Sequence, residues 1–380
     1  MKNKVLRIAL NIFFVAAVVA VVILFRSFFS DLTVKIIMKS AEWFLPCEAV
    51  LNYEASKEEK TTEKEEETTE DIKETTIAET TEKAVSALLE NSFYETPEDI
   101  QKLISRAKKN SSKDKKDGAI FEKQYKNEGV TDKFGVVKVK NTNKTKISVE
   151  NLLEKKADLS VDKEKPSVLI FHTHTTESYQ ILDRDFYAVG HLTRSNDSSK
   201  NMVRVGEAIV EELEKAGFNV IHDKTVYDTK YSGAYERSRT AVIEYLKKYP
   251  TIQVVLDIHR DAIEEANGTK IKPVAKINGK KAAQVMIISG CQEEGNGIED
   301  FPDWKENLVF ALQLQKSMEE NFSSLTRPLF FCPRRYNMHL THCSLLLEVG
   351  SDSNTLEEAV FSGSCIGKSL ALLMEKYTEK

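Results

Sequence analysis

The chain begins with one long hydrophobic segment, becomes strongly polar, and regains apolar residues only in its second half. Residues 8–25 (IALNIFFVAAVVAVVILF) contain a single polar side chain, Asn11. A helix of this length rises about 27 Å, which is close to the thickness of a bilayer's hydrocarbon core. Lys2, Lys4 and Arg7 precede it, a bias that favours a cytoplasmic N-terminus. The pattern predicts an uncleaved single-pass membrane anchor. The alternative, a cleaved signal peptide, would have an unusually long apolar region.

Polar and amphipathic segments follow the anchor. Residues 31–53 are amphipathic and are expected to lie at the membrane surface or to contact a partner. Residues 54–83 are mainly Thr, Glu and Lys without aromatics, a composition that cannot offset its own ordering entropy. The predicted organisation is a cytoplasmic tip and transmembrane anchor (1–30), a juxtamembrane segment (31–53), and an acidic Thr/Glu-rich disordered linker with a short helical patch (54–117). An extracytoplasmic folded domain (118–380) follows.

From residue 167 onward, short apolar runs alternate with amphipathic segments. The runs 167–171, 252–258 and 344–349 are typical of strands buried on both faces. Asn278-Gly279 predicts a hairpin turn between strands at 269–277 and 282–288. Helical spacing is found at 201–216, 232–248, 303–321 and 355–377, and weak alternation at 120–153 indicates a β-rich beginning. This alternation predicts an α/β fold with a mostly parallel sheet covered by helices.

Charge and cysteine content exclude two classes of protein. The net charge is −5, and no basic stripe with interleaved aromatics occurs in the second half, so nucleic acid is not an expected partner. The five cysteines are odd in number and form no CxxC pair. They are therefore expected to be mostly free, buried thiols rather than a disulfide framework.

Ionisable side chains follow or end three of the predicted strands. They are His172, His174 and Glu177 after 167–171, Asp257 and His259 at the end of 252–258, and Glu348 in 344–349. In open α/β sheets, ligands bind beyond the carboxyl ends of the strands. We therefore expect these side chains to converge at one edge of the sheet.

Histidines and carboxylates in this arrangement suit a catalytic zinc ion. Such a site uses three protein ligands and leaves one position for water, and a further carboxylate moves the proton. Glu348 ends four apolar residues, where an unused charge would be costly, and Asp257 is placed to orient a ligand histidine. His339 and His342 are a rival pair, but they precede a strand and are expected to be loop residues. Cys343, at a strand start, is discounted as a nucleophile.

Five segments, in order and spanning roughly 165–377, carry a resemblance to a known family. They are FHTHTTESY, NMVRVGEAIVEELEKAGFNV, LDIHRDA, RPLFFCPRRYNMHL and LLLEVGSDSNTLEEA. Together they resemble the stage II sporulation protein P family. The resemblance implies a fold like that of zinc N-acetylmuramoyl-L-alanine amidases. It also implies amidase and endopeptidase activity on septal peptidoglycan during engulfment, between the mother-cell and forespore membranes, with stage II sporulation proteins D and M as partners.

The resemblance also implies roles for individual residues. His259 corresponds to a zinc-ligand histidine and Glu348 to the catalytic glutamate, while the first histidine ligand is His172 or His174. The acidic ligand is Glu177, or Asp197 if it directly precedes the helix near residue 201. Arg260 and Arg335 are candidates for binding a peptide carboxylate or an oxyanion. Two alternatives remain: a zinc endopeptidase that cuts only the stem peptide, and a non-catalytic scaffold that binds the wall.

Overall fold

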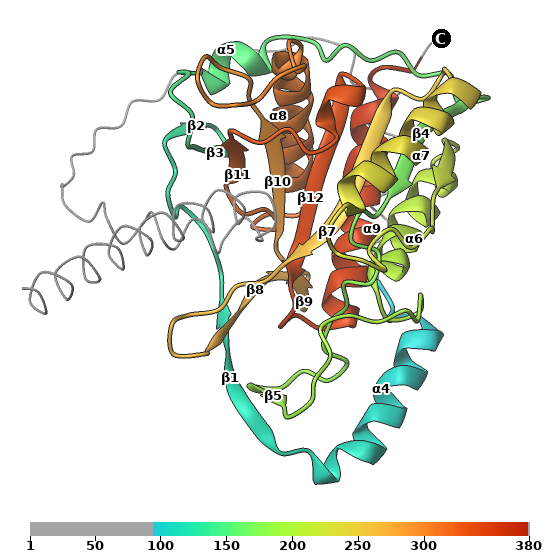
Figure 1. Cartoon of the computed structure of the whole chain (residues 1–380), viewed down its shortest axis with the longest axis vertical. Helices are drawn as coiled ribbons and strands as arrows, with labels where there is room; N and C mark the ends of the chain where they lie inside the picture. Colours follow the sequence, from blue (N-terminus) through green and yellow to red (C-terminus); the bar gives the residue numbers. More distant parts are fainter. Residues whose placement is uncertain (1–93, 379–380) are drawn as a thin grey trace, which may run out of the picture. The chain divides into compact units, whose positions relative to one another are not determined.

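The computed structural model describes residues 94–378 (Figure 1). The predicted anchor, the juxtamembrane segment and the acidic run at 54–83 lie outside the described residues. Between residues 94 and 378, no helix combines the length and hydropathy needed to cross a membrane.

An eight-stranded sheet forms the centre of the fold, in the order β2-β3-β11-β10-β12-β7-β4-β6. Its strands are β2 (Asp132–Phe134), β3 (Val137–Asn141), β4 (Pro166–Phe171), β6 (Asn219–His222), β7 (Val254–Asp261), β10 (Val285–Gly290), β11 (Leu329–Cys332) and β12 (Cys343–Ser351). The α/β class is confirmed, but the expectation of a mostly parallel sheet was wrong. The sheet is mixed, because β10 is antiparallel to β12 and β2 is antiparallel to β3.

A second sheet of four strands was not predicted. Its order is β5-β1-β8-β9, with β1 (Lys116–Lys123), β5 (Phe186–Ala188), β8 (Lys270–Ile277) and β9 (Lys280–Ala283). The hairpin turn at Asn278-Gly279 is confirmed, and both residues adopt positive φ. The run predicted as one strand at 282–288 splits at Gln284. That buried side chain pairs with both the amide and the carbonyl of Tyr125, and β10 then enters the large sheet.

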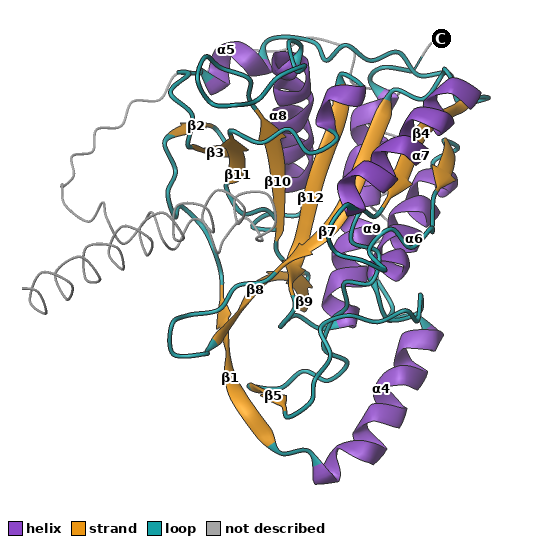
Figure 2. Ribbon diagram, in the orientation of Figure 1, coloured by secondary structure: helices purple, strands orange, loops and turns teal. Residues whose placement is uncertain are grey.

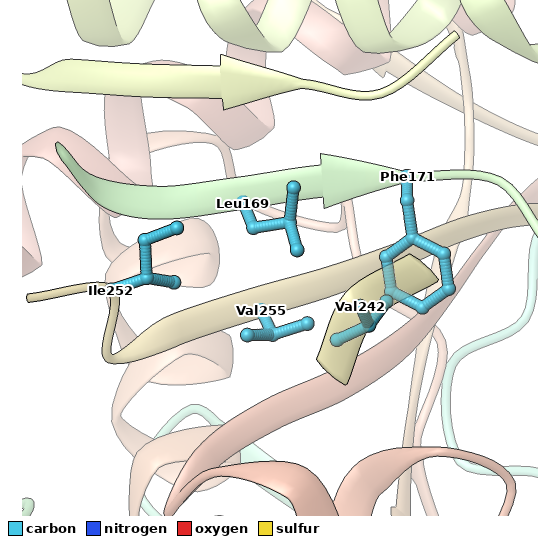
Figure 3. Close-up of a cluster of buried hydrophobic side chains, with 5 residues drawn as sticks. All are labelled: Leu169, Phe171, Val242, Ile252 and Val255. Atoms are coloured by element: carbon cyan, nitrogen blue, oxygen red, sulfur yellow. The ribbon is translucent and has the colours of Figure 1, made fainter. Parts of the chain in front are cut away.

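Helices cover both faces of the large sheet (Figure 2). The described helices are α4 (Glu98–Asn110), α5 (Val149–Leu153), α6 (Met202–Lys215), α7 (Ala234–Lys248), α8 (Trp304–Asn321) and α9 (Leu356–Glu375), with 3₁₀ turns at Ser111–Lys113 and Met338–Leu340. Helix α4 lies away from the large sheet (Figure 1). Figure 3 shows Val242 of α7 packed against Leu169 and Phe171 of β4 and Val255 of β7. Because successive strand side chains alternate between faces, Val168 and Ile170 point to the opposite side, where α6 contacts the sheet.

Helices α6 and α9 approach each other closely at two glycines. A Cβ on Gly363 would lie 2.8 Å from the carbonyl oxygen of Val205, and one on Gly367 would lie 2.7 Å from that of Ile209. A methyl group at either position would force the helices apart. Small residues at this seam are therefore required by the packing.

The first described residues pack on this helical layer, although they belong to the predicted linker. The ring of Tyr94 stacks on Phe361 with centroids 4.5 Å apart. Asp99 of α4 accepts two hydrogen bonds from the guanidinium of Arg204, at 2.8 and 3.3 Å. Together they attach the segment that precedes β1 to α6 and α9.

Candidate metal centre

The three strand ends singled out by sequence lie next to one another. β4, β7 and β12 are adjacent and parallel, with Phe171 beside Asp257 and Glu348 beside His259 in the strand registers. Neighbouring strands are about 4.8 Å apart, so His259 and Glu348 lie side by side on one face. The loop after β4 brings His174 and Glu177 to the same edge.

Four side chains of this edge form a buried cluster, which we call the His–Glu cluster: His174, Glu177, His259 and Glu348. Each is no more than 6% exposed. Nδ1 of His259 lies 3.6 Å from Oε2 of Glu177. The rings of His174 and His259 meet edge to face with centroids 5.3 Å apart. The predicted convergence of two histidines and two glutamates is therefore present in the structure.

The loop between β4 and α6 is held by two buried aspartates. Asp257 accepts hydrogen bonds from the backbone nitrogen and hydroxyl of Thr173, at 2.8 and 2.6 Å, and lies 2.8 Å from Nε2 of His259. Asp228 accepts from the backbone nitrogen and hydroxyl of Thr176, at 3.1 and 2.6 Å. These contacts fix the backbone on both sides of His174.

Burial and neighbouring charges shift the acid–base properties of the cluster. Burial raises the pKa of Glu348 to about 7, with the nearby charge of Glu177 adding to the effect. Burial lowers the pKa of His174 to about 3. Burial also disfavours the charged form of His259, but the nearby carboxylate of Asp257 outweighs this effect and raises the pKa of His259 to about 9. A carboxyl group that titrates near neutral pH is suited to both accepting and donating a proton.

The cluster fits the donor set expected for zinc. Among the described residues, Nδ1 of His174 and Oε2 of Glu348 are buried without a hydrogen-bond partner. Nε2 of His259 lies 2.8 Å from a carboxylate oxygen of Asp257, but it makes no hydrogen bond of acceptable geometry with any described residue. Buried polar atoms normally have partners. Imidazole nitrogens and carboxylate oxygens are the ligands that catalytic zinc uses.

His172 lies outside the His–Glu cluster. Its Nδ1 is 3.1 Å from the carbonyl oxygen of Ile258, and its Nε2 is 3.0 Å from Nε2 of His222. The ring packs against Gly206 of α6, where an added Cβ would lie 2.7 Å from Nε2 of His172. Of the two histidines left open by the sequence, only His174 is brought to Glu177 and His259.

The other predicted residues also lie apart from the cluster or act on it indirectly. Asp197 is exposed and pairs with Lys200 at 2.6 Å. The guanidinium of Arg260 donates to the carbonyls of Ser178, Thr193 and Asp261, while its backbone nitrogen donates to Glu177 Oε2 at 3.2 Å. The Arg260 guanidinium is thus held by backbone carbonyls on both sides of the loop. Arg335 donates to the carbonyl of Glu299 at 2.8 Å.

Sequence reasoning missed several residues around the cluster. Arg194 pairs with Asp228 and lies 3.6 Å from Oε1 of Glu177. Tyr231 stacks on His174 with ring centroids 4.6 Å apart, and Tyr235 lies parallel to His259 at 6.2 Å. The available signal was topological. Helix α7 follows the parallel strand β6, so its N-terminal end must lie at the carboxyl edge of the sheet.

A second acidic group, formed by Glu122, Asp183 and Glu358, is held by a lysine. Their carboxylate oxygens lie within 4.8 Å of one another. Lys272, only 1% exposed, approaches all three carboxylates at 3.0, 2.6 and 2.7 Å. An ammonium group already neutralises the position that a cation would take, so this group is a structural ion-pair network.

The remaining predicted residues behave as loop and core residues. His342 pairs with Asp158 on the surface, and His339 lies in the 3₁₀ turn before β12. The four cysteines in the described range, Cys291, Cys332, Cys343 and Cys365, are free and buried as expected. Burial raises the pKa of the Cys343 thiol, which makes it a poor nucleophile.

Comparison with known proteins gives the following relatives. Stage II sporulation protein P from Bacillus subtilis (strain 168) is 31% identical over 212 residues, which cover 51% of this chain and 48% of that protein. The match thus spans about half the length of each protein. Among solved structures, the N-acetylmuramoyl-L-alanine amidase AmiC2 of Nostoc punctiforme is 12% identical with a TM-score of 0.33, and the match covers 57% of this chain and 98% of AmiC2. The CwlD amidase from Clostridioides difficile in complex with the GerS lipoprotein is 13% identical with a TM-score of 0.33. That match covers 56% of this chain and 98% of the solved chain.

The family comparison extends over most of the sequence. The model of the family described as "Stage II sporulation protein P (SpoIIP)" matches residues 27–371. This range includes the His–Glu cluster and the strands that carry it, as well as residues 27–93, which precede the described residues. The chain belongs to the stage II sporulation protein P family.

Proposed function

We propose that this protein is a zinc-dependent peptidoglycan hydrolase of sporulation, an N-acetylmuramoyl-L-alanine amidase that also has endopeptidase activity. The proposal depends on one observation: the buried side chains of His174, Glu177, His259 and Glu348 lie next to one another at the carboxyl edge of the sheet. Family membership supports a role in sporulation, and the resemblance carried by the sequence motifs implies a fold like that of zinc amidases.

In the proposed site, His174, Glu177 and His259 would hold the metal. A bound zinc ion would polarise the amide carbonyl and lower the pKa of its water. Glu348, with its pKa raised to about 7 by burial, accepts a proton from the attacking water and returns it to the leaving amine. Tyr231, which is 39% exposed, covers one face of His174 and limits the solvent that reaches it.

Surrounding residues hold this arrangement in place. Asp257 restrains His259 and Thr173 together, while the backbone of Arg260 restrains Glu177. Metal-bound histidines commonly need such a partner to fix ring orientation. The buried aspartate and the ordered loop therefore preorganise the ligands before substrate arrives.

The wider setting also forms part of the proposal. Residues 8–25 anchor the chain in the membrane, and the catalytic domain acts on septal peptidoglycan between the mother-cell and forespore membranes during engulfment. Stage II sporulation proteins D and M are the proposed partners. The anchor proposal stands on the apolar run and its preceding positive charges.

Digestion of purified peptidoglycan by the full chain tests the activity. Mass spectrometry should detect free stem peptide from amidase cleavage and shortened cross-links from endopeptidase cleavage, with about one zinc per chain by metal analysis. Glu348→Gln should lower the rate by about 10²- to 10⁴-fold. Glu294→Gln, an exposed site, is the matched control.

The same experiment separates the alternatives. Shortened cross-links without free stem peptide would identify an endopeptidase alone. A wild-type chain that binds peptidoglycan without zinc or cleavage would identify a wall-binding scaffold. Full activity in Glu348→Gln would overturn the proposed role of that carboxylate.

A further inference from the structure

A cavity of about 370 Å³ lies beside the His–Glu cluster. One wall is formed by the end of α4 and the turn after it, from Ala107 to Asp114. The other is formed by the loop that runs from Ser178 to Lys200. Its volume falls within the range of small-ligand sites. We call this cavity the α4 pocket.

The α4 pocket is connected to the cluster through shared residues. Ser178, in its wall, directly follows Glu177. Arg194 also lines the pocket, and its guanidinium lies 3.6 Å from Glu177 Oε1 and pairs with buried Asp228. A substrate held at the cluster could therefore extend into this cavity.

Three cations, Arg184, Arg194 and Lys200, line the pocket. Each is paired with a carboxylate: Arg184 with Asp114, Arg194 with Asp228 and Lys200 with Asp197. These pairs hold the cationic groups in place, so a ligand would meet them through hydrogen-bond donors that the pairs leave unused.

The pocket residues also carry unused hydrogen-bonding groups. Nε2 of Gln180, Nε of Arg184 and Nε2 of His191 are buried and have no hydrogen-bond partner in the part of the chain described. Gln180 is only 3% exposed. The Arg184 guanidinium is fixed by Asp114 at 2.6 Å and lies over the Phe186 ring. Two of the three nitrogens are N–H donors for any tautomer, and buried donors normally have acceptors.

We propose that the α4 pocket is a substrate subsite that binds a free carboxylate of the peptidoglycan stem peptide, with Arg184 and Gln180 as its specificity-determining residues. This inference rests on the proposed function, because it assigns the subsite to the same substrate. A carboxylate supplies both the negative charge and the paired acceptors that a guanidinium and an amide recognise. The scissile amide then lies at the cluster while the peptide extends along the loop from Ser178 to Lys200.

Calorimetric titration of the full-length Glu348→Gln chain tests the subsite without turnover. The probes are a muramyl stem peptide with free carboxylates and the same peptide with every carboxylate converted to carboxamide. We expect the carboxamide to bind at least about 10-fold more weakly, since charge-assisted hydrogen bonds are about twice as strong as neutral ones. Arg184→Gln in this background should remove the difference, and Arg184→Lys should restore part of it. Arg106→Gln, an exposed arginine outside the pocket wall, should leave the difference intact.

The outcomes separate the subsite from the proposed activity. Equal binding of the two peptides, or an unchanged preference in a folded Arg184→Gln chain, would overturn the subsite even if peptidoglycan is hydrolysed. A clear carboxylate preference in a wild-type chain that lacks hydrolytic activity would support the subsite and overturn the proposed function. If Arg184→Gln does not fold, Gln180→Leu removes a donor without breaking the Arg184–Asp114 pair. Retained preference in that variant would also count against the subsite.

Discussion

Individual residues at the site owe their properties to burial and to one or two neighbours. Glu348 and Glu177 are both buried glutamates, yet they differ in contacts: Glu177 receives a hydrogen bond from the Arg260 backbone, whereas Oε2 of Glu348 has none from the described residues. Burial without a compensating donor raises the pKa of Glu348. The sequence singled out Glu348 because an ionisable residue at the end of a buried apolar run is costly without a use, and Glu177 because it follows a histidine pair, three residues after His174. It did not distinguish His172 from His174, because their directions depend on packing around the loop.

Asp257→Asn should weaken zinc binding by about 10- to 100-fold, because the aspartate restrains both His259 and Thr173. Competition with a chelator of known affinity measures the change. Asp158→Asn, which alters an exposed aspartate, serves as the control and should bind zinc like the wild type. Unchanged affinity in Asp257→Asn would show that His259 needs no such restraint.

Buried His172 and partly buried His222, whose rings are in contact, should make the fold sensitive to acid. Burial lowers the pKa of His172 to about 4, and burial together with His172 lowers that of His222. Both rings stay neutral in the folded chain while the unfolded chain takes up protons below about pH 6.5. The stability that comes from keeping these rings neutral is therefore fully present above about pH 6.5 and is lost as pH falls. Each ring should lower the free energy of unfolding by about 2 kcal/mol between pH 7 and pH 5.

Urea unfolding of the full chain at both pH values checks this. His222→Gln should lose about 2 kcal/mol less than the wild type between pH 7 and pH 5, since one titrating ring is removed. His342→Gln is the opposite control, because Asp158 raises the pKa of this partly exposed histidine. That variant should lose stability at least as steeply as the wild type on acidification. An unaltered pH dependence in His222→Gln would contradict the explanation.

At the scale of elements, the sequence was most informative where periodicity was long and ends were marked. The helices predicted at 201–216, 303–321 and 355–377 correspond to α6, α8 and α9, and Thr355 forms a capping box with Glu358. The strand predicted at 282–288 was wrong as a single unit. A continuous apolar run looks the same whether it stays in one sheet or crosses into another, and the crossing at Gln284 depends on Tyr125, far away in sequence.

Gly367→Val should destabilise the protein by about 1–3 kcal/mol through overpacking. The added side chain would begin 2.7 Å from the carbonyl oxygen of Ile209 in α6, so the two helices must separate. Denaturant unfolding gives the free-energy change. Lys368→Val is a partly exposed neighbour in the same helix and should cost only the helix-propensity difference, below about 0.7 kcal/mol. Equal losses in both variants would show that the α6–α9 seam tolerates a larger residue.

At the scale of the whole molecule, one buried lysine ties segments from distant parts of the chain. Lys272 lies in β8 and contacts Glu122 in β1, Asp183 in the loop before β5 and Glu358 in α9. Burial disfavours its charge, but the surrounding carboxylates outweigh this and raise its pKa. The network joins the four-stranded sheet to the helix that packs on the large sheet. It thereby supports the loop that separates Glu177 from α6.

Lys272→Met should destabilise the fold by about 3–5 kcal/mol, because buried Glu358 would lose its cation. The matched control is Lys281→Met. Lys281 approaches two of the same carboxylates, but its side chain is 33% exposed, and its loss should cost no more than about 1 kcal/mol. Urea unfolding compares the two variants. Similar small losses in both would show that the buried charge is dispensable.

The sequence by itself determined the α/β class, most of the helices, the hairpin turn, the free cysteines and the family, because these depend on local periodicity, turn chemistry and ordered motifs. It also supplied the His and Glu residues that line the carboxyl edge. Tertiary structure decided what depends on strand neighbours and side-chain direction. This includes the mixed sheet, the second sheet, the turning of His172 toward His222, and the assembly of Arg194, Asp228 and Tyr231 around His174. These features arise from contacts between residues far apart in the chain, and no pattern along the chain encodes which distant segments will meet.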